Sequence, residues 1–299
     1  VVDFLELLIN ALIAGILLGG FFAALSIGLS ICFGLLDTVN LAHPTLIVAA
    51  AFCTFLLNDL FGLDPILAGI IITPVFFVIG WMIYTAYYQF FEKNSAEALR
   101  GLAFFFGLLF ITEVILIMVF GVDHRLVNAP YIGQSMGLAL GSVDVSIPYR
   151  LLVAFVVAAI MTLGLQMFLD RSFFGRATRA VHQDMMALSL MGVNPVTIKR
   201  IAFALGLATC GLAGALMIVV IPIEPAVGRL FIGNVFAIVV LGGLGSISGT
   251  LIAAMILGIA ESLVSTFFGP SWAPAVSFGI LLGVLAFKPT GLLGVGDTR

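Results

Sequence analysis

Nine apolar stretches follow one another along the 299 residues of the chain. A helix needs about 20 apolar residues to cross the hydrocarbon core of a bilayer, and most of these stretches are long enough. Two of them, 44–58 and 230–245, are shorter, and we expect them to be broken or re-entrant. The sequence therefore predicts an all-α, polytopic transmembrane helical bundle with eight or nine spans. The stretches lie near residues 12–36, 44–58, 65–90, 101–121, 149–169, 200–222, 230–245, 250–268 and 273–288.

The composition indicates that lipid is the solvent for most of these side chains. Hydrophobic residues make up 62% of the chain and charged residues 9%, whereas soluble domains contain about 45–50% and about 25%. The cysteines Cys32, Cys53 and Cys210 lie inside apolar stretches, so we interpret them as small hydrophobic residues and predict no metal site. We treat residues 1–299 as one transmembrane domain. Its net charge of −3 does not indicate nucleic-acid binding.

The basic residues predict the orientation of the chain. If the spans alternate, nine of the twelve fall on one side, and the positive-inside rule makes that side cytoplasmic. Nine spans then place the N-terminus outside and the C-terminus inside. Most of the inner charge lies in a loop at 170–199, and a second long segment, 122–148, lies outside. The nine inner residues are Lys93, Arg100, Arg171, Arg176, Arg179, Lys199, Arg200, Lys288 and Arg299; Arg125, Arg150 and Arg229 are assigned to the outer side.

Two polar, helix-breaking segments, 37–44 and 242–249, interrupt the apolar pattern. Irregular backbone is tolerated in a membrane only where protein or water covers it, and paired interruptions point to a transporter's binding site. The glycine-rich second segment would also present backbone N–H groups suited to a carboxylate. The alternative is that both segments are cytoplasmic turns. The predicted pathway residues here are Asn40 and His43 in the first segment and Gly245, Ser246 and Ser248 in the second.

A possible internal repeat accompanies these breaks. Residues 45–49, Thr-Leu-Ile-Val-Ala, resemble residues 250–254, Thr-Leu-Ile-Ala-Ala, and each run follows a polar break. Both runs point in the same direction in the predicted topology, so a parallel repeat is one interpretation. Chance is the other, because Leu, Ile and Ala are abundant in this chain.

Two glutamates, Glu113 and Glu261, lie within apolar spans. An ionisable residue at that depth is costly, so it is expected to face a cavity or a partner and to be functional. We include both among the predicted pathway residues. The structural alternative is a glutamate that is hydrogen-bonded between helices.

The inner loop contains a short apolar segment among its charges. Met185, Met186, Leu188, Ser189 and Met191 are predicted to share one face of a short helix that Gly192 ends. Methionine suits adaptable contacts, so this helix is expected to enter a groove on another protein. The alternative is an amphipathic helix that lies on the membrane surface.

Several runs of residues together resemble the permease subunits of ATP-binding-cassette (ABC) importers for branched-chain amino acids. The resemblance follows the order of the chain over nearly its whole length. Pro44 departs from the pattern, because the family usually has glycine after the histidine. Proline would stiffen this turn. The matching runs are 23–29, 39–43, 175–180 with Asp184 and Ala187, 191–194, 241–249, Glu261 and 288–294.

The resemblance implies a fold, partners and a place in the cell. It implies two such permeases, two cytoplasmic ATPase subunits and an extracytoplasmic solute-binding protein in a bacterial plasma (inner) membrane. ATP is used by the partner subunits, so this chain is expected to bind no cofactor and to be no enzyme. Relatives import urea, short amides or aromatic acids as well as amino acids. The resemblance further implies an ATPase-coupling helix that comprises Asp184, Met185, Met186, Ala187, Leu188, Met191 and Gly192.

Two other classes of function were weighed. A secondary transporter driven by protons or sodium would use Glu113 and Glu261 for coupling and would need no ATPase. An ATPase or an intramembrane enzyme is disfavoured. The chain has no Gly-x-x-x-x-Gly-Lys phosphate loop, no His-Glu-x-x-His zinc motif and no paired Asp-rich motif. We also expect no Gly-x-Ser-x-Gly nucleophile motif.

Overall fold

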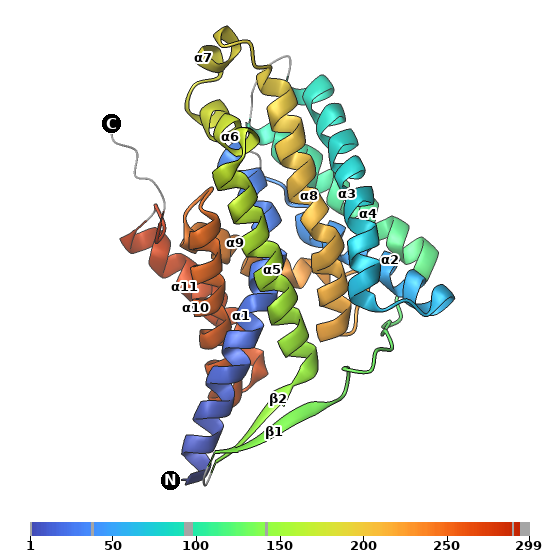
Figure 1. Cartoon of the computed structure of the whole chain (residues 1–299), viewed down its shortest axis with the longest axis vertical. Coiled ribbons are helices and arrows are strands. Elements are labelled where there is room, and N and C mark those ends of the chain that lie inside the picture. The colour runs from blue at the N-terminus through green and yellow to red at the C-terminus, as the bar shows by residue number, and fades with distance from the viewer. Residues whose placement is uncertain (1, 37–38, 93–97, 141–142, 289, 294–299) are drawn as a thin grey trace.

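The computed structural model describes residues 2–36, 39–92, 98–140, 143–288 and 290–293 as a bundle of helices with one small hairpin (Figure 1). Within these residues, eight helical segments are long and apolar enough to cross a membrane, and α9 is a ninth, shorter apolar helix. The predicted fold class is confirmed. The helices are α1 Val2–Leu36, α2 His43–Phe61, α3 Pro65–Tyr87, the π-helix η1 Tyr88–Glu92, α4 Ala98–Phe120, α5 Tyr149–Arg171, α6 Phe173–Gln183, α7 Met185–Leu190, α8 Pro195–Val220, α9 Gly228–Gly242, α10 Ile247–Phe268, the 3-10 turn η2 Pro270–Trp272 and α11 Ala273–Phe287.

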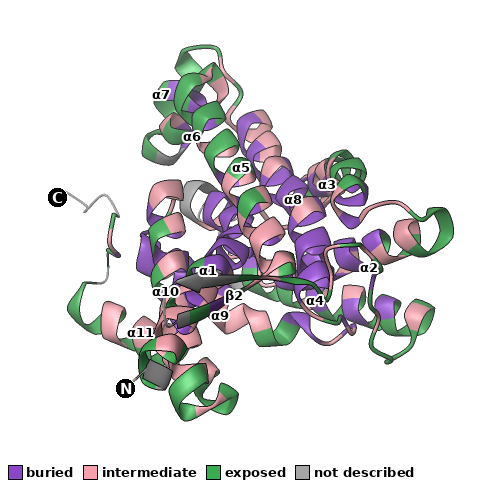
Figure 2. Cartoon of the chain, turned by 60° about the horizontal axis from the view of Figure 1, so that its bottom comes forward, coloured by how far each residue is buried: buried purple, intermediate pink, exposed green. Residues whose placement is uncertain are grey.

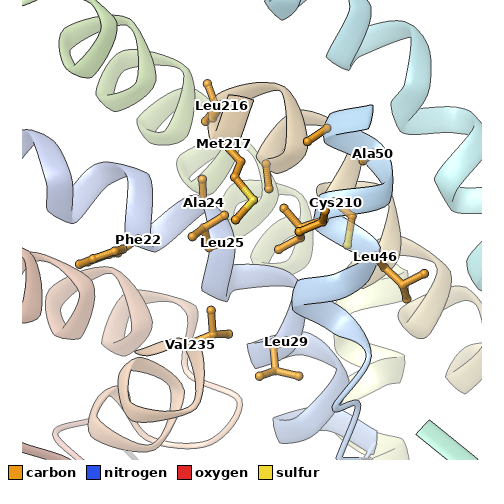
Figure 3. Packing of buried hydrophobic residues seen from close by; sticks show 14 of the residues in the cluster. Phe22, Ala24, Leu25, Leu29, Leu46, Ala50, Cys210, Leu216, Met217 and Val235 are labelled. Atoms are coloured by element: carbon orange, nitrogen blue, oxygen red, sulfur yellow. The ribbon is translucent and has the colours of Figure 1, made fainter. Parts of the chain in front are cut away.

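Helix α8 forms the centre of the bundle. It is apolar on all sides, and such a helix is stable only when neighbours surround it; it packs against α1, α2 and α3. Figure 2 shows buried residues gathered in the middle and exposed ones on the outer faces. In the close view of Figure 3, Leu25 of α1, Ala50 of α2 and Met217 of α8 lie in one packed cluster.

Small residues allow α1 and α10 to approach closely. A Cβ added at Gly258 would lie 2.4 Å from the backbone nitrogen of Gly19 and 2.6 Å from the carbonyl oxygen of Gly15. Lipid tails are as apolar as the helix surfaces, so the hydrophobic effect does not drive helices together in a membrane. Close van der Waals packing contributes to their association instead. The glycines near the start of the chain therefore set the packing of α1 on α10.

The segment between α4 and α5 forms an antiparallel hairpin, β1 Ser135–Leu140 and β2 Val143–Pro148. Two asparagines attach this segment to the bundle. Asn10 Oδ1 accepts a 2.9 Å hydrogen bond from the amide of Ser146. Asn58 Nδ2 donates to the carbonyl of Asn128 at 3.1 Å. The hairpin therefore lies at the end of the bundle where α1 begins (Figure 1).

The basic loop lies at the opposite end of the long axis. Helices α6 and α7 project there (Figure 1), and Ser172, Asp184 and Asn194 cap α6, α7 and α8 with side-chain oxygens. This arrangement agrees with the predicted separation of inner and outer segments. Two basic residues used for that prediction, Lys93 and Arg299, lie outside the described residues.

Candidate functional site

The described part of the first polar break, residues 39–44, lies within the bundle; residues 37–38 lie outside the described residues. Asn40 and His43 are fully buried, and His43 Nδ1 lies 3.6 Å from the Cys210 sulfur in the middle of α8. Asn40 Oδ1 accepts a 3.1 Å bond from the amide of Ala42. Asn40 Nδ2 and His43 Nε2 have no hydrogen-bond partner among the described residues. Buried polar atoms normally have one, so this break holds unused hydrogen-bonding capacity.

Two helix N-termini meet beside this break. A Cβ added at Gly228, the first residue of α9, would lie 3.1 Å from the Cα of Thr45 in the first turn of α2. Each N-terminus carries a partial positive charge, so their contact creates a locally positive region. Pro44 lies in the first turn of α2, where proline is tolerated because the first N–H groups of a helix have no intrahelical partner.

Glu113 pairs with an arginine inside the bundle. Its carboxylate contacts Arg229 twice, at 2.7 Å to Nε and 2.7 Å to Nη2. The chain after α8 folds back, so Arg229 lies on the first turn of α9 and faces α4. The Glu113 side chain is 6% exposed and that of Arg229 is 50% exposed.

Glu261 is held at the meeting of three helices. Asn234 of α9 donates a 2.9 Å hydrogen bond to its Oε1, and the hydroxyl of Ser277 on α11 donates to the same oxygen. The side chain is mostly buried. Glu113 and Glu261 therefore do not pair with each other, and each has a separate partner on α9.

The second polar break lies near the α5–α6 corner, away from the first. Ser246 caps α10 by accepting a 3.0 Å bond from the amide of Gly249. Ser248 accepts a 2.8 Å bond from Gln166 of α5. Gly245 has a φ of +78°, a conformation that favours glycine. These residues line a polar cavity of about 170 Å³ with Asp170 and Arg179. The structure therefore places the seven predicted pathway residues in separate groups with different partners.

The predicted short helix of the inner loop is present as α7. Asp184 Oδ1 caps it with 2.9 Å bonds from the amides of Met186 and Ala187, and Gly192 follows at a φ of +81°. The prediction of one shared face was wrong, because Leu188 is buried against α6 and α8. Met185, Met186 and Ser189 remain exposed. The exposed apolar residues include Met186 (75%), Leu190 (83%) and Met191 (80%).

The sequence reasoning missed Leu190. Its spacing of four residues from Met186 is the signal that places both on one face of a helix.

One enzyme motif was also overlooked. Residues 133–137, Gly-Gln-Ser-Met-Gly, fit the pattern Gly-x-Ser-x-Gly. A hydrolase nucleophile requires a sharp turn from a strand to a helix. Ser135 instead begins β1 of the hairpin and is exposed. Ser135 therefore does not lie on the strand-to-helix turn that a hydrolase nucleophile requires.

Comparison with known proteins defines the class of this membrane protein. The family model of the branched-chain amino acid transport system permease component matches residues 11–285. The chain belongs to this family. No solved structure matches it.

Two curated relatives match nearly the whole chain. The permease protein BraD of Pseudomonas aeruginosa is 30% identical over 96% of this chain and 95% of its own length. LivH of Escherichia coli is 28% identical over 94% and 93%. LivM of Salmonella typhimurium matches a shorter part, 31% identical over 40% of this chain and 28% of its own length. The names of all three describe permease proteins of high-affinity branched-chain amino acid transport systems.

Proposed function

We propose that this chain is the permease subunit of an ABC importer and forms part of the pathway for branched-chain amino acids across a bacterial inner membrane. The family match over residues 11–285 carries this proposal. ATP hydrolysis takes place in two cytoplasmic ATPase subunits, and a soluble binding protein delivers the solute from outside. This chain supplies the pathway and the surface on which the ATPases act.

A second, homologous permease completes the pathway. LivH and LivM of Escherichia coli are two different permease proteins of one named transport system, and this chain is similar to both. The match to LivH covers most of the chain, whereas the match to LivM covers 40% of it. We therefore expect this chain to take the place of LivH in a pair of unlike permeases.

Helix α7 is the proposed contact with an ATPase. It projects beyond the ends of the long helices (Figure 1), and Met186, Leu190 and Met191 expose apolar surface there. Apolar side chains gathered at a charged, water-facing end indicate a protein partner. Because α7 lies beyond the ends of the long helices, its position favours contact with a groove on another protein rather than with the membrane surface.

The test is co-purification of the tagged chain from its native membrane. The parent chain should carry ATPase subunits and a second permease. Met186→Asp should lose the ATPases and ATP-driven uptake while the second permease stays bound, because a charge would enter an apolar groove. Met186→Leu is the matched control and should retain both. Leu188 is unsuitable for this test because its burial would confound folding with docking.

The competing function is ion-coupled secondary transport through Glu113 and Glu261. A chain that purifies alone and moves solute in liposomes without ATP would establish it and overturn the importer proposal. The contacts of both glutamates favour structural roles, since Glu113 forms an ion pair and Glu261 accepts two hydrogen bonds.

A further inference from the structure

The Glu113–Arg229 pair lies at the depth of the hydrocarbon core. Glu113 is seven residues before the outer end of α4, about 10 Å along the axis at 1.5 Å per residue. A second estimate, made along α8, gives a similar depth for the start of α9. Gly214 of α8 packs on Ile47 of α2 and is six residues, or about 9 Å, from the outer end of α8. The start of α9, which touches the first turn of α2, therefore lies inside the bilayer.

The arginine of this pair is open on one side. Half of the Arg229 side chain is exposed, compared with 6% of Glu113. Glu113 takes two of the five guanidinium N–H groups, which leaves three that this pair does not use. A cation at this depth does not face acyl chains, because that costs several kcal/mol. The exposed side of Arg229 therefore faces water or another protein.

Arg229 directly follows the first residue of α9, where the helix N-terminus adds a partial positive charge. The N-termini of α2 and α9 meet at Thr45 and Gly228, and the carboxylate of Glu113 balances only the guanidinium. The N–H groups of the half-exposed guanidinium that Glu113 does not use are donors suited to an anion.

We propose that Arg229 binds the carboxylate of the transported amino acid, on a water-facing surface formed by α4 and the first turn of α9. This inference rests on the proposed function, and it identifies Arg229 as the side chain that recognises the transported amino acid. Glu113 positions the guanidinium and offsets its charge, so the solute is held weakly enough to leave. The apolar side chain of the solute then extends away from the charged pair.

Thiol labelling of the complete importer in lipid nanodiscs tests whether this surface is wet. In a Cys53→Ser parent, Arg229→Cys is compared with Ile111→Cys. Ile111 is two residues from Glu113 on α4 and 60% exposed, so it reports a lipid-facing position at the same depth. A charged methanethiosulfonate should modify Arg229→Cys at least tenfold faster, since only a hydrated thiol ionises. Equal, slow labelling would mean that a partner permease covers Arg229 and would overturn the proposal.

A pair of double variants tests the carboxylate contact without leaving a buried charge alone. Glu113→Gln with Arg229→Gln, and Glu113→Gln with Arg229→Lys, differ only in the cation. The double variant with Arg229→Gln should take up leucine about tenfold more slowly than the one with Arg229→Lys. This factor corresponds to the loss of one charge-assisted hydrogen bond to the carboxylate of the solute. Equal uptake by the two would overturn the proposal. ATP-driven leucine uptake by the unmodified parent tests the proposed function separately.

Discussion

Gly28 marks the point where α1 crosses α8 beside the first turn of α2, and alanine there would have no space. A Cβ at Gly28 would lie 2.3 Å from the carbonyl oxygen of Gly206, 2.3 Å from Thr209 Oγ1 and 2.6 Å from His43 Cε1. The two side chains can rotate or shift. The carbonyl oxygen of Gly206 belongs to the central helix and moves only if α1 and α8 separate.

The size of the effect follows from two opposing terms. Overpacking a tight contact costs about 1–3 kcal/mol, while alanine in place of a helical glycine contributes up to about 1 kcal/mol. Because a backbone atom is among the clashes, we expect Gly28→Ala to lower the free energy of unfolding by about 1–2 kcal/mol, roughly a 5–30-fold change in the folded-to-unfolded ratio. Gly107→Ala on α4 is the matched control, since nothing lies within 4 Å of its added Cβ.

Equilibrium unfolding in mixed micelles of rising dodecyl sulfate content, followed by circular dichroism, measures both variants. Gly28→Ala should unfold at a lower denaturant fraction than the parent, and Gly107→Ala at the same or a higher one. Leucine uptake should fall in Gly28→Ala alone, because the clash displaces His43. If Gly28→Ala is as stable as Gly107→Ala, the close packing of α1 on α8 is refuted.

Three further predictions concern other contacts. Lys199→Met should lower the free energy of unfolding by about 3 kcal/mol, since it leaves the mostly buried Glu92 carboxylate without its 2.7 Å partner. Adding Glu92→Leu should recover only part of the loss, because the buried Tyr84 hydroxyl then loses its acceptor on Glu92; a double variant no more stable than the single one would contradict this. Asn10→Ala should speed amide exchange at Ser146 in the hairpin, measured by mass spectrometry, whereas unchanged exchange would mean that the strand pairing alone protects it. Glu261→Gln should keep more than about half of the parent's leucine uptake, because a glutamine oxygen also accepts hydrogen bonds; loss of uptake with intact ATPase assembly would instead favour a proton-carrying role.

The spans were predictable because the bilayer fixes the length of a crossing helix. The predicted stretch 149–169 corresponds to α5, Tyr149–Arg171, and 250–268 to α10, Ile247–Phe268. The hairpin between α4 and α5 was not predicted. Its two strands have six residues each. A sequence pattern of that length is a weak signal compared with an apolar stretch of about twenty residues.

The candidate site was less predictable, because it depends on contacts between distant parts of the chain. Counting charges by segment assigned Arg229 to the outer side but could not identify its partner, because Glu113 lies 116 residues away in the chain. Leu188 was assigned by local periodicity to the exposed face of α7. Its burial depends on α6 and α8, which local spacing does not encode.

Helix α9 connects the two polar breaks. This helix has 15 residues, about 22 Å at 1.5 Å per residue, and is too short to cross a bilayer alone. Its first residue, Gly228, packs on the first turn of α2, and its last, Gly242, lies where an added Cβ would be 2.5 Å from the amide of Thr250, directly after the second break. Asn234, between these ends, contacts Glu261. A shift of α9 along its axis would therefore change both breaks and both glutamates together, so movement at the inner face and exposure of Arg229 are expected to be coupled.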